Sequence, residues 1–328
     1  MKRSIGFICS FLALFVLWSH PVHAIGLQPA IIELSADPGQ TIHTNVELTN
    51  DESVTKIFYS SIQKFIAKGQ DGRQEFLPLK DQEGLPGWIS IPQTSYIITP
   101  GETRKIPIEI KVLSNAEPGG YYAALFFSSY TLDADDYAGQ TPDADDLNQG
   151  TVGLRVGSLI FFTVDGAVRP TYTIRAFALD QDPTGEFLPA VFHIYTQNDG
   201  KVHVIPRGQI VITDMLGRRV ATLPVNGEGG RLMPHSIREF DVTWWITPPL
   251  PGSGFFHHVI EELRNFAFGT YKAQLQMDGA TPPANPDILT EKFAIRRTHY
   301  FIFVVVGVLV LWALVHFLRR PRKHPIVT

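Results

Sequence analysis

Apolar and polar residues alternate with a period of two in short runs along much of the chain. Residues 42–48 and 106–112 show this most clearly, and the pattern is typical of strands with one buried face. Turn sequences rich in Pro, Gly, Asn and Asp separate the runs, as at 37–40 and 99–102. Residues 121–127 are apolar throughout, which predicts a central strand buried on both faces.

The spacing of these runs predicts an all-β ectodomain made of two tandem immunoglobulin-like β-sandwiches, at 25–168 and 169–278. In the first, residues 152–164 are expected to pair as a hairpin with 121–130. Asn198-Asp199-Gly200 predicts a tight turn in the second. The strands expected in the second sandwich are 171–179, 190–197, 202–213, 218–224, 236–245 and 269–277.

Three segments depart from the strand pattern. Residues 131–150 contain the sequence Asp-Ala-Asp-Asp twice. Paired carboxylates suit calcium binding, but the loop lacks the fixed ligand spacing of an EF-hand, so a mobile acidic loop is the simpler interpretation. Residues 256–267 carry apolar side chains at helical spacing and predict a short amphipathic helix packed on the sandwich. Residues 279–298 contain several prolines and predict a stalk.

The two ends predict export and anchoring. Residues 1–24 have the basic start, apolar middle and small residues of a signal peptide, with cleavage expected after Ala24. Residues 300–318 are apolar apart from His316 and predict a transmembrane helix at 299–318. Basic residues dominate 319–328, which predicts a cytoplasmic tail and places the ectodomain outside a cell membrane crossed once. No LPxTG-type sorting motif precedes the helix, so it is expected to be retained.

Composition limits the chemistry that the chain can perform. The single cysteine, Cys9, lies in the predicted signal peptide, so disulfides, thiol catalysis and cysteine metal sites are not expected in the exported part. The net charge of −4 comes without a basic stripe, and no nucleic-acid partner is expected.

No arrangement of residues predicts an active site. The ectodomain histidines follow no spacing that would join them to carboxylates, and each is interpreted as a surface or satisfied histidine. No nucleophile elbow, phosphate loop or metalloprotease sequence occurs. The chain is therefore predicted to be non-enzymatic, with no cofactor and no metal. These histidines are His43, His193, His203, His235, His257 and His258.

Four side chains are candidate ligand contacts. Trp88 follows Leu-Pro-Gly in a predicted loop, where an aromatic ring could stack on a sugar. Lys64, Lys68 and Arg73 flank a predicted hairpin tip at 69–72 and could meet an anionic wall polymer, although a solvated turn is the simpler interpretation. Other large aromatics, such as Tyr121, Tyr122 and Trp244, lie within strand runs and are expected in the core.

Several local sequences together resemble the WxL-interacting proteins of Gram-positive surfaces. In the first domain the resemblance rests on 34–40 with Asn50, Trp88-Ile89, 99–102 and 118–121. In the second it rests on 198–204, 206–208, 214–217, 225–226, 232–234 and 240–245. The resemblance implies a peptidoglycan-binding domain, a second domain that binds a partner or host surface, and a C-terminal transmembrane helix. The acidic loop and the candidate helix depart from it.

Three functional hypotheses follow. The first is a membrane-anchored bacterial surface protein that binds cell-wall glycan, another surface protein, or both. The alternative is a tethered chaperone-like module that captures client strands of exported subunits on an exposed strand edge. The third is an enzyme with an unrecognised site, which would require a cleft with several perturbed ionisable residues.

Overall fold

The computed structural model describes residues 25–131, 154–180, 190–246, 252, 260, 269–282, 286–295 and 298–318. The predicted signal peptide (1–24) and basic tail (319–328) lie outside these residues, as do nearly all of the acidic loop (131–150) and of the helix (256–267). The chain forms two compact units. The first comprises Met1–Ile66 and Gln74–Val168, and the second comprises Ala67–Arg73 and Arg169–Thr328.

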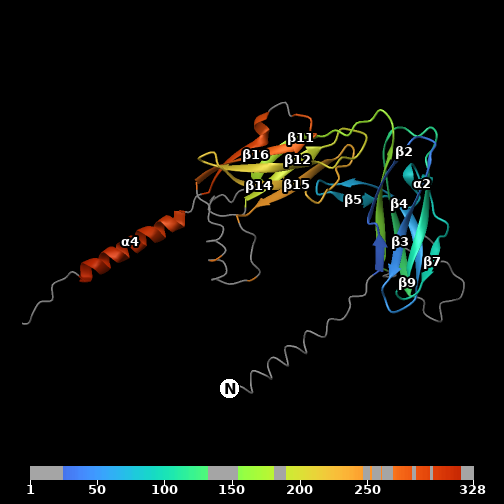
Figure 1. Ribbon diagram of the computed structural model, residues 1–328, viewed down its shortest axis with the longest axis horizontal. Coiled ribbons are helices and arrows are strands. Elements are labelled where there is room, and N and C mark those ends of the chain that lie inside the picture. Colours follow the sequence, from blue (N-terminus) through green and yellow to red (C-terminus); the bar gives the residue numbers. More distant parts are fainter. Residues whose placement is uncertain are drawn as a thin grey trace, which may run out of the picture. The chain divides into compact units, whose positions relative to one another are not determined.

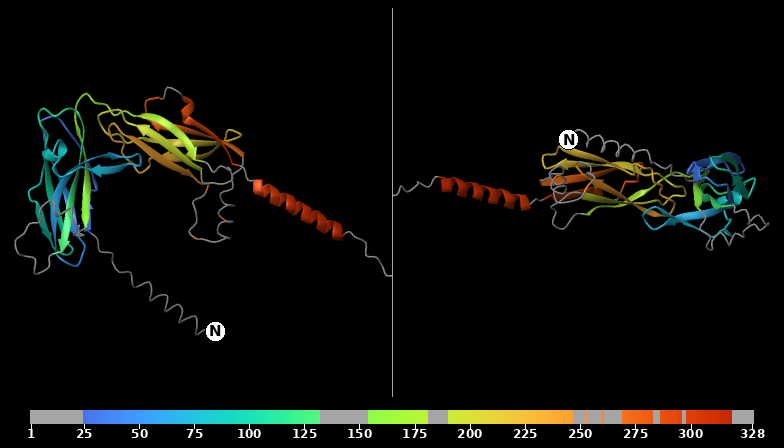
Figure 2. Two further views of the ribbon diagram at one scale, coloured as in Figure 1. Left: turned by 180° about the vertical axis from the view of Figure 1, so that it is seen from behind. Right: turned by 90° about the horizontal axis from the view of Figure 1, so that it is seen from below.

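The first unit is a β-sandwich (Figures 1 and 2). Its elements are β1 (Ile25–Gln28), β2 (Ile31–Ala36), β3 (Thr41–Asn50), β4 (Lys56–Lys68), β5 (Arg73–Phe76), the helical turn α2 (Leu85–Trp88), β6 (Ile89–Ser90), β7 (Ser95–Ile98), β8 (Thr103–Lys111), β9 (Gly119–Thr131) and β10 (Arg155–Val164). One sheet has the order β1-β3-β8-β6, and the other has the order β2-β10-β9-β4-β5 with β7 paired to β4. The predicted hairpin pairing is confirmed, because β10 runs antiparallel to β9 along its whole length.

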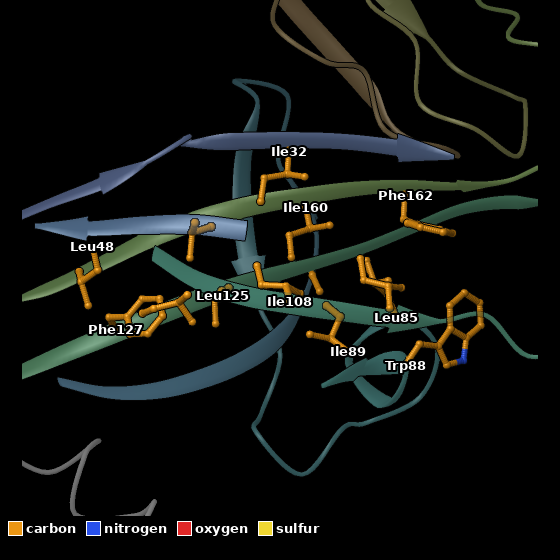
Figure 3. Packing of buried hydrophobic residues seen from close by; sticks show 14 of the residues in the cluster. Ile32, Leu48, Leu85, Trp88, Ile89, Ile108, Leu125, Phe127, Ile160 and Phe162 are labelled. Atoms are coloured by element: carbon orange, nitrogen blue, oxygen red, sulfur yellow. The ribbon is translucent and has the colours of Figure 1, made fainter. Parts of the chain in front are cut away.

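The core of the first unit lies between these two sheets. Alternate residues of β9 point into it, namely Ala123, Leu125 and Phe127, as the period of two requires. Trp88 belongs to the same cluster and is 8% exposed. Figure 3 shows its indole at one end of the cluster, and its ring centroid lies 4.5 Å from that of Tyr121.

The second unit is a sandwich of a three-stranded and a four-stranded sheet, with orders β11-β12-β15 and β14-β13-β16-β17. Buried residues from both sheets form its core, including Phe192, Ile210, Trp244 and Leu275. The predicted all-β architecture of two successive β-sandwiches is thus confirmed. The elements are β11 (Thr173–Asp180), β12 (Ala190–Gln197), β13 (Arg207–Asp214), β14 (Arg219–Val225), β15 (Ile237–Trp244), β16 (Gly269–Asp278), the 3₁₀ turn η2 (Pro286–Leu289) and β17 (Thr290–Ile295).

The predicted stalk at 279–298 is wrong for its second half. Residues Thr290–Ile295 form β17, which pairs antiparallel with β16. Phe293 and Ile295 are 6% and 2% exposed in the core. The prolines before this segment suggested a linker, but burial of these two apolar side chains draws the strand into the sheet.

A buried asparagine fixes a loop of the first unit. The Asn50 side chain is fully buried, and its Nδ2 donates to Val54 O at 2.9 Å and to Ile98 O at 3.0 Å. Its Oδ1 accepts from the backbone N–H of Glu52 at 3.2 Å. One side chain therefore binds three backbone groups and joins residues 50–54 to the end of β7.

Asn198 does the same in the second unit. Its Nδ2 donates to Val202 O at 2.8 Å and Leu232 O at 3.0 Å, and its Oδ1 accepts from Gly200 N at 2.8 Å. The chain turns at Asn198-Asp199-Gly200 as predicted, but the turn closes no hairpin, since β12 pairs with β11 and β15 whereas β13 belongs to the other sheet. The asparagine holds a crossover between sheets.

The last described element is the helix α4 (Thr298–Leu318). Its side-chain environment is described for residues 305–316, where the large apolar side chains are exposed. A search of the described part of the chain finds no helix whose length and apolarity suffice to cross a membrane.

Replacing either buried asparagine should destabilise only the unit that contains it. Asn50→Ala or Asn198→Ala removes the side-chain partner of two backbone carbonyls and one backbone N–H, and we expect the free energy of unfolding of that unit to fall by about 3 kcal/mol. Urea unfolding of the full chain in detergent measures this. Asn45→Ala, at a half-buried position of β3, is the control and should change stability by less than about 0.5 kcal/mol. Equal losses from all three would contradict the assignment.

Trp88→Ala should act on stability. Removing a buried tryptophan leaves a cavity, so we expect the first unit to lose about 3–5 kcal/mol. Phe76→Ala, which removes a 40% exposed ring, should cost roughly half as much. Unchanged urea stability of Trp88→Ala, together with loss of sedimentation with peptidoglycan, would restore Trp88 as a ligand contact.

Candidate functional site

One edge of β10 is open over its first residues. β2 runs parallel to β10 only from Leu159 onward, where Leu159 pairs with Ile31. The backbone N–H of Leu159 donates to Ala30 O at 2.9 Å. Within the described residues, no strand lies on this side of β10 between Arg155 and Ser158. This open part is called the β10 edge below.

The N–H and C=O groups of successive residues in a strand point to opposite edges, and this alternation determines which groups the β10 edge presents. Leu154 O accepts from Ser129 N at 2.9 Å, so Leu154 faces β9, whereas the Leu159 N–H faces β2. Residues of odd number in this strand therefore direct their N–H and C=O groups away from β9. Arg155 and Gly157 accordingly present two donors and two acceptors outward. Such a row of unpaired groups is a template for another strand.

An outer-face aromatic cluster lies beside this edge, on the side of the sheet away from the core. Its rings come from four strands and contact one another, with centroids 5.5 Å apart for Phe65 and Phe161 and 5.0 Å apart for Phe76 and Phe126. Phe65 and Phe161 are buried, but Phe76 is 40% exposed. The cluster consists of Phe65, Phe76, Tyr122, Phe126 and Phe161.

The Arg155 side chain runs from the β10 edge back over β9 toward β4. Its guanidinium carbon is 3.7 Å from the centroid of the Phe126 ring, and Nη2 donates to Gln63 Oε1 at 2.5 Å. Burial lowers the pKa of the Arg155 guanidinium, which stays protonated at physiological pH. No carboxylate pairs with it among the described residues. The site therefore offers a cation that is positioned but not neutralised.

Gly157 leaves room for the Phe126 ring. The two residues are direct cross-strand partners, and a Cβ on Gly157 would approach the ring to 2.6 Å. Glycine therefore lets the aromatic ring lie over β10 and reach Arg155. The exposed side chain of Leu154, at 50%, stands directly before this segment.

Of the four residues predicted to contact a ligand, Trp88 does not lie in an exposed loop. The Leu-Pro-Gly sequence before it forms the helical turn α2, which places the indole in the core. An aromatic ring buried in this way cannot stack on a sugar.

The three basic candidates lie on β4 and β5, as predicted. Lys64 is half-buried and its Nζ lies 3.9 Å from Glu83 Oε2. Lys68 is exposed at the end of β4, and Arg73 is exposed and paired with Asp71. Gly69 and Gly72 have φ values of 66° and 79°, so the tip is the predicted turn.

A hollow of about 630 Å³ in the second unit has ionisable residues at its rim. Arg218 Nη2 lies 2.7 Å from Asp214 Oδ2. Burial raises the pKa of the Asp214 carboxyl, but hydrogen bonds from the Arg218 backbone and side chain outweigh it and lower the pKa. Asp214 also accepts from Leu216 N at 2.9 Å, so the pair holds the turn before β14.

No family model and no curated protein matches this sequence. Solved structures that resemble the chain include the class 5 fimbriae chaperone CfaA, at 9% identity and a TM-score of 0.36, covering 83% of this chain and 99% of that one. The CsuC–CsuE chaperone–tip adhesion subunit pre-assembly complex of Acinetobacter baumannii has 10% identity, covers 83% and 98%, and has a TM-score of 0.36. The Pseudomonas aeruginosa CupB2 chaperone has 12% identity, covers 83% and 100%, and has a TM-score of 0.35.

Proposed function

We propose that this chain is a non-enzymatic, membrane-anchored surface protein whose first unit binds an extended segment of a partner protein along the β10 edge. The observation that carries the proposal is the outward row of backbone donors and acceptors at Arg155 and Gly157. An extended peptide that adds a strand gains main-chain hydrogen bonds there, and its side chains give specificity. This function corresponds to the chaperone-like alternative and to the protein half of the surface-binding hypothesis.

The side chains around the β10 edge indicate which residues a bound segment would carry. Leu154 and Phe76 offer exposed apolar surface, which suits apolar residues of the added strand. The Arg155 guanidinium lies over Phe126, on the sheet face inward of the edge, and suits a carboxylate on a partner side chain that reaches over that face, because charge-assisted hydrogen bonds are the strong ones. We therefore expect a segment with alternating apolar residues and an acidic group.

The edge has a simpler interpretation, in which Arg155 and Gly157 merely discourage unwanted strand pairing. Charged side chains and short lengths do protect natural edges. Two observations favour binding over protection. The Arg155 guanidinium is drawn onto Phe126 and Gln63 instead of extending over the edge, and Leu154 adds apolar surface where protection would require charge.

If the chain also binds wall glycan, we expect the contact at the hairpin of β4 and β5. Lys68 and Arg73 are exposed there and could approach an anionic polymer. Burial of Trp88 removes the one aromatic contact that the sequence suggested for a sugar.

Anchoring is proposed from α4 and the predicted signal peptide. Thr298–Leu318 form a helix, and in the sequence residues 300–318 are apolar apart from His316, the pattern that predicts a membrane anchor. The exposed apolar side chains of 305–316 suit lipid. Together with an export signal at 1–24, this gives a single-pass protein with both sandwiches outside and the tail in the cytoplasm.

Site-specific photocrosslinking in the cells that naturally produce the chain tests the partner. A photoreactive residue at Leu154 should give one defined protein adduct, whereas the same residue at Leu113, which is 52% exposed and follows β8, should not. Arg155→Pro removes an outward N–H but none that faces β9, so we expect the adduct to be lost while the urea midpoint of the first unit falls no further than in Arg155→Ala, which loses the same side-chain contacts with Phe126 and Gln63 but keeps the N–H.

Two outcomes would overturn strand addition. One is equal crosslinking at Leu154 and Leu113. The other is the absence of any adduct at Leu154 while the purified full chain still sediments with insoluble peptidoglycan, which would favour the glycan function.

Truncation tests the anchor. A chain that ends at Ile295 keeps β17 and lacks α4, and we expect it to move from the membrane fraction to the soluble exported fraction. A second chain that ends at Asp278 also lacks β17 and should be degraded, because Phe293 and Ile295 no longer fill the core. Retention of the Ile295 variant in the membrane fraction would contradict anchoring by α4.

A further inference from the structure

A histidine and two carboxylates converge on the outer face of the β11-β12-β15 sheet. His193 on β12 is the cross-strand partner of Asp241 on β15, and Tyr195 is the partner of Glu239. Because side chains alternate, these four residues share one face of the sheet. The residues between them, such as Ile194, point to the opposite face and are buried in the core.

The ligand-type atoms of three of these residues are close together. His193 Nδ1 lies 2.9 Å from Glu239 Oε1 and 2.8 Å from Asp241 Oδ1. All three atoms lie within 4.8 Å of one another. The side chains of His193 and Glu239 are 24% and 28% exposed, and that of Asp241 is 60% exposed, so the cluster is supported by the sheet and open to solvent on one side.

Tyr195 holds the Glu239 carboxylate in place. Its phenol donates to Glu239 Oε1 at 2.6 Å. This hydrogen bond raises the pKa of the Tyr195 phenol, and burial and the nearby carboxylates act in the same direction. Hydrogen bonds of this kind to a ligating carboxylate commonly orient it in metal sites.

The charges in the cluster are not balanced by the protein. Neither Glu239 nor Asp241 pairs with a lysine or arginine among the described residues, and His193 is the one basic group that contacts them. A neutral imidazole carries one hydrogen, which cannot fully satisfy two carboxylates at the same nitrogen. Two anionic groups two residues apart on one strand therefore lack a cation.

We propose that His193, Glu239 and Asp241 bind a divalent first-row transition metal of the Zn²⁺ type. One imidazole nitrogen and two carboxylate oxygens are a set that zinc accepts, with water completing the coordination on the exposed side. Bonds of about 2.0–2.2 Å place tetrahedral ligands roughly 3.4 Å apart, so the side chains need to separate by only about 0.5 Å. The imidazole disfavours Ca²⁺ and Mg²⁺, which prefer oxygen ligands alone.

Such a metal would join β12 to β15. β15 is at the edge of its sheet, and a metal that binds both strands stabilises the folded second unit, because the three ligands are not assembled in the unfolded chain. This inference is independent of the partner proposed for the first unit.

Equilibrium dialysis of the full chain in detergent against ZnCl₂ and CaCl₂ tests the site. We expect Zn²⁺ to bind and to raise the unfolding temperature of the second unit, with no response to Ca²⁺. His193→Ala and Asp241→Asn should each weaken Zn²⁺ binding at this site at least tenfold and abolish the thermal shift. Asp241→Asn keeps the size of the side chain, which guards against a folding defect. Tyr195→Phe should weaken binding by about tenfold.

A second cross-strand histidine supplies the matched control. His43 Nδ1 lies 3.9 Å from Glu109 Oε2, with one carboxylate instead of two, so His43→Ala should bind Zn²⁺ like the unchanged chain. The proposal would be overturned if His193→Ala bound Zn²⁺ and showed the same thermal shift as the unchanged chain. An equal response of the unchanged chain to Ca²⁺ would also overturn it.

Discussion

The two-sided burial of β9 is the constraint on which the first unit depends. This strand pairs with β4 along one edge and with β10 along the other, and its side chains alternate between the core on one face and the aromatic cluster on the other. Leu125 and Phe127 point into the core between the sheets, while Tyr122 and Phe126 point to the outer face. Because β10 is paired to β9 throughout, only its other edge can accept a partner, and Phe126 determines where the Arg155 cation lies beside it.

Local chemistry was sufficient to predict much of this fold from the sequence. Period-two alternation and Pro-Gly turns located most strands within a few residues, and the apolar run at 121–127 identified the central strand, since each signal lies within a few neighbouring residues. Trp88 and β17 were misread because their environments are set by distant segments. A Pro-Gly sequence is compatible with a loop or a helical turn, and only packing against Tyr121 and Phe162 distinguishes them.

The candidate sites were harder to predict than the strands that carry them. The β10 edge exists because β2 joins β10 only at Leu159, which depends on pairing between segments more than a hundred residues apart. His193 and Asp241 likewise meet only through the register of β12 and β15. Glu239 and Asp241 share a face through the period of two within one strand, but a one-residue slip in register would place His193 on the other face.

The two proposed sites use the same property of β-sheets in opposite ways. An edge strand has backbone groups without a partner on one side, so it can add another strand or must be protected from doing so. In the first unit the β10 edge is flanked by apolar side chains and a cation, which favours addition. In the second unit β15 is also an edge strand, and a metal held by His193, Glu239 and Asp241 would fasten it to β12. Fastening opposes the fraying that strand exchange requires, so the chain would direct strand addition to one edge and resist it at the other.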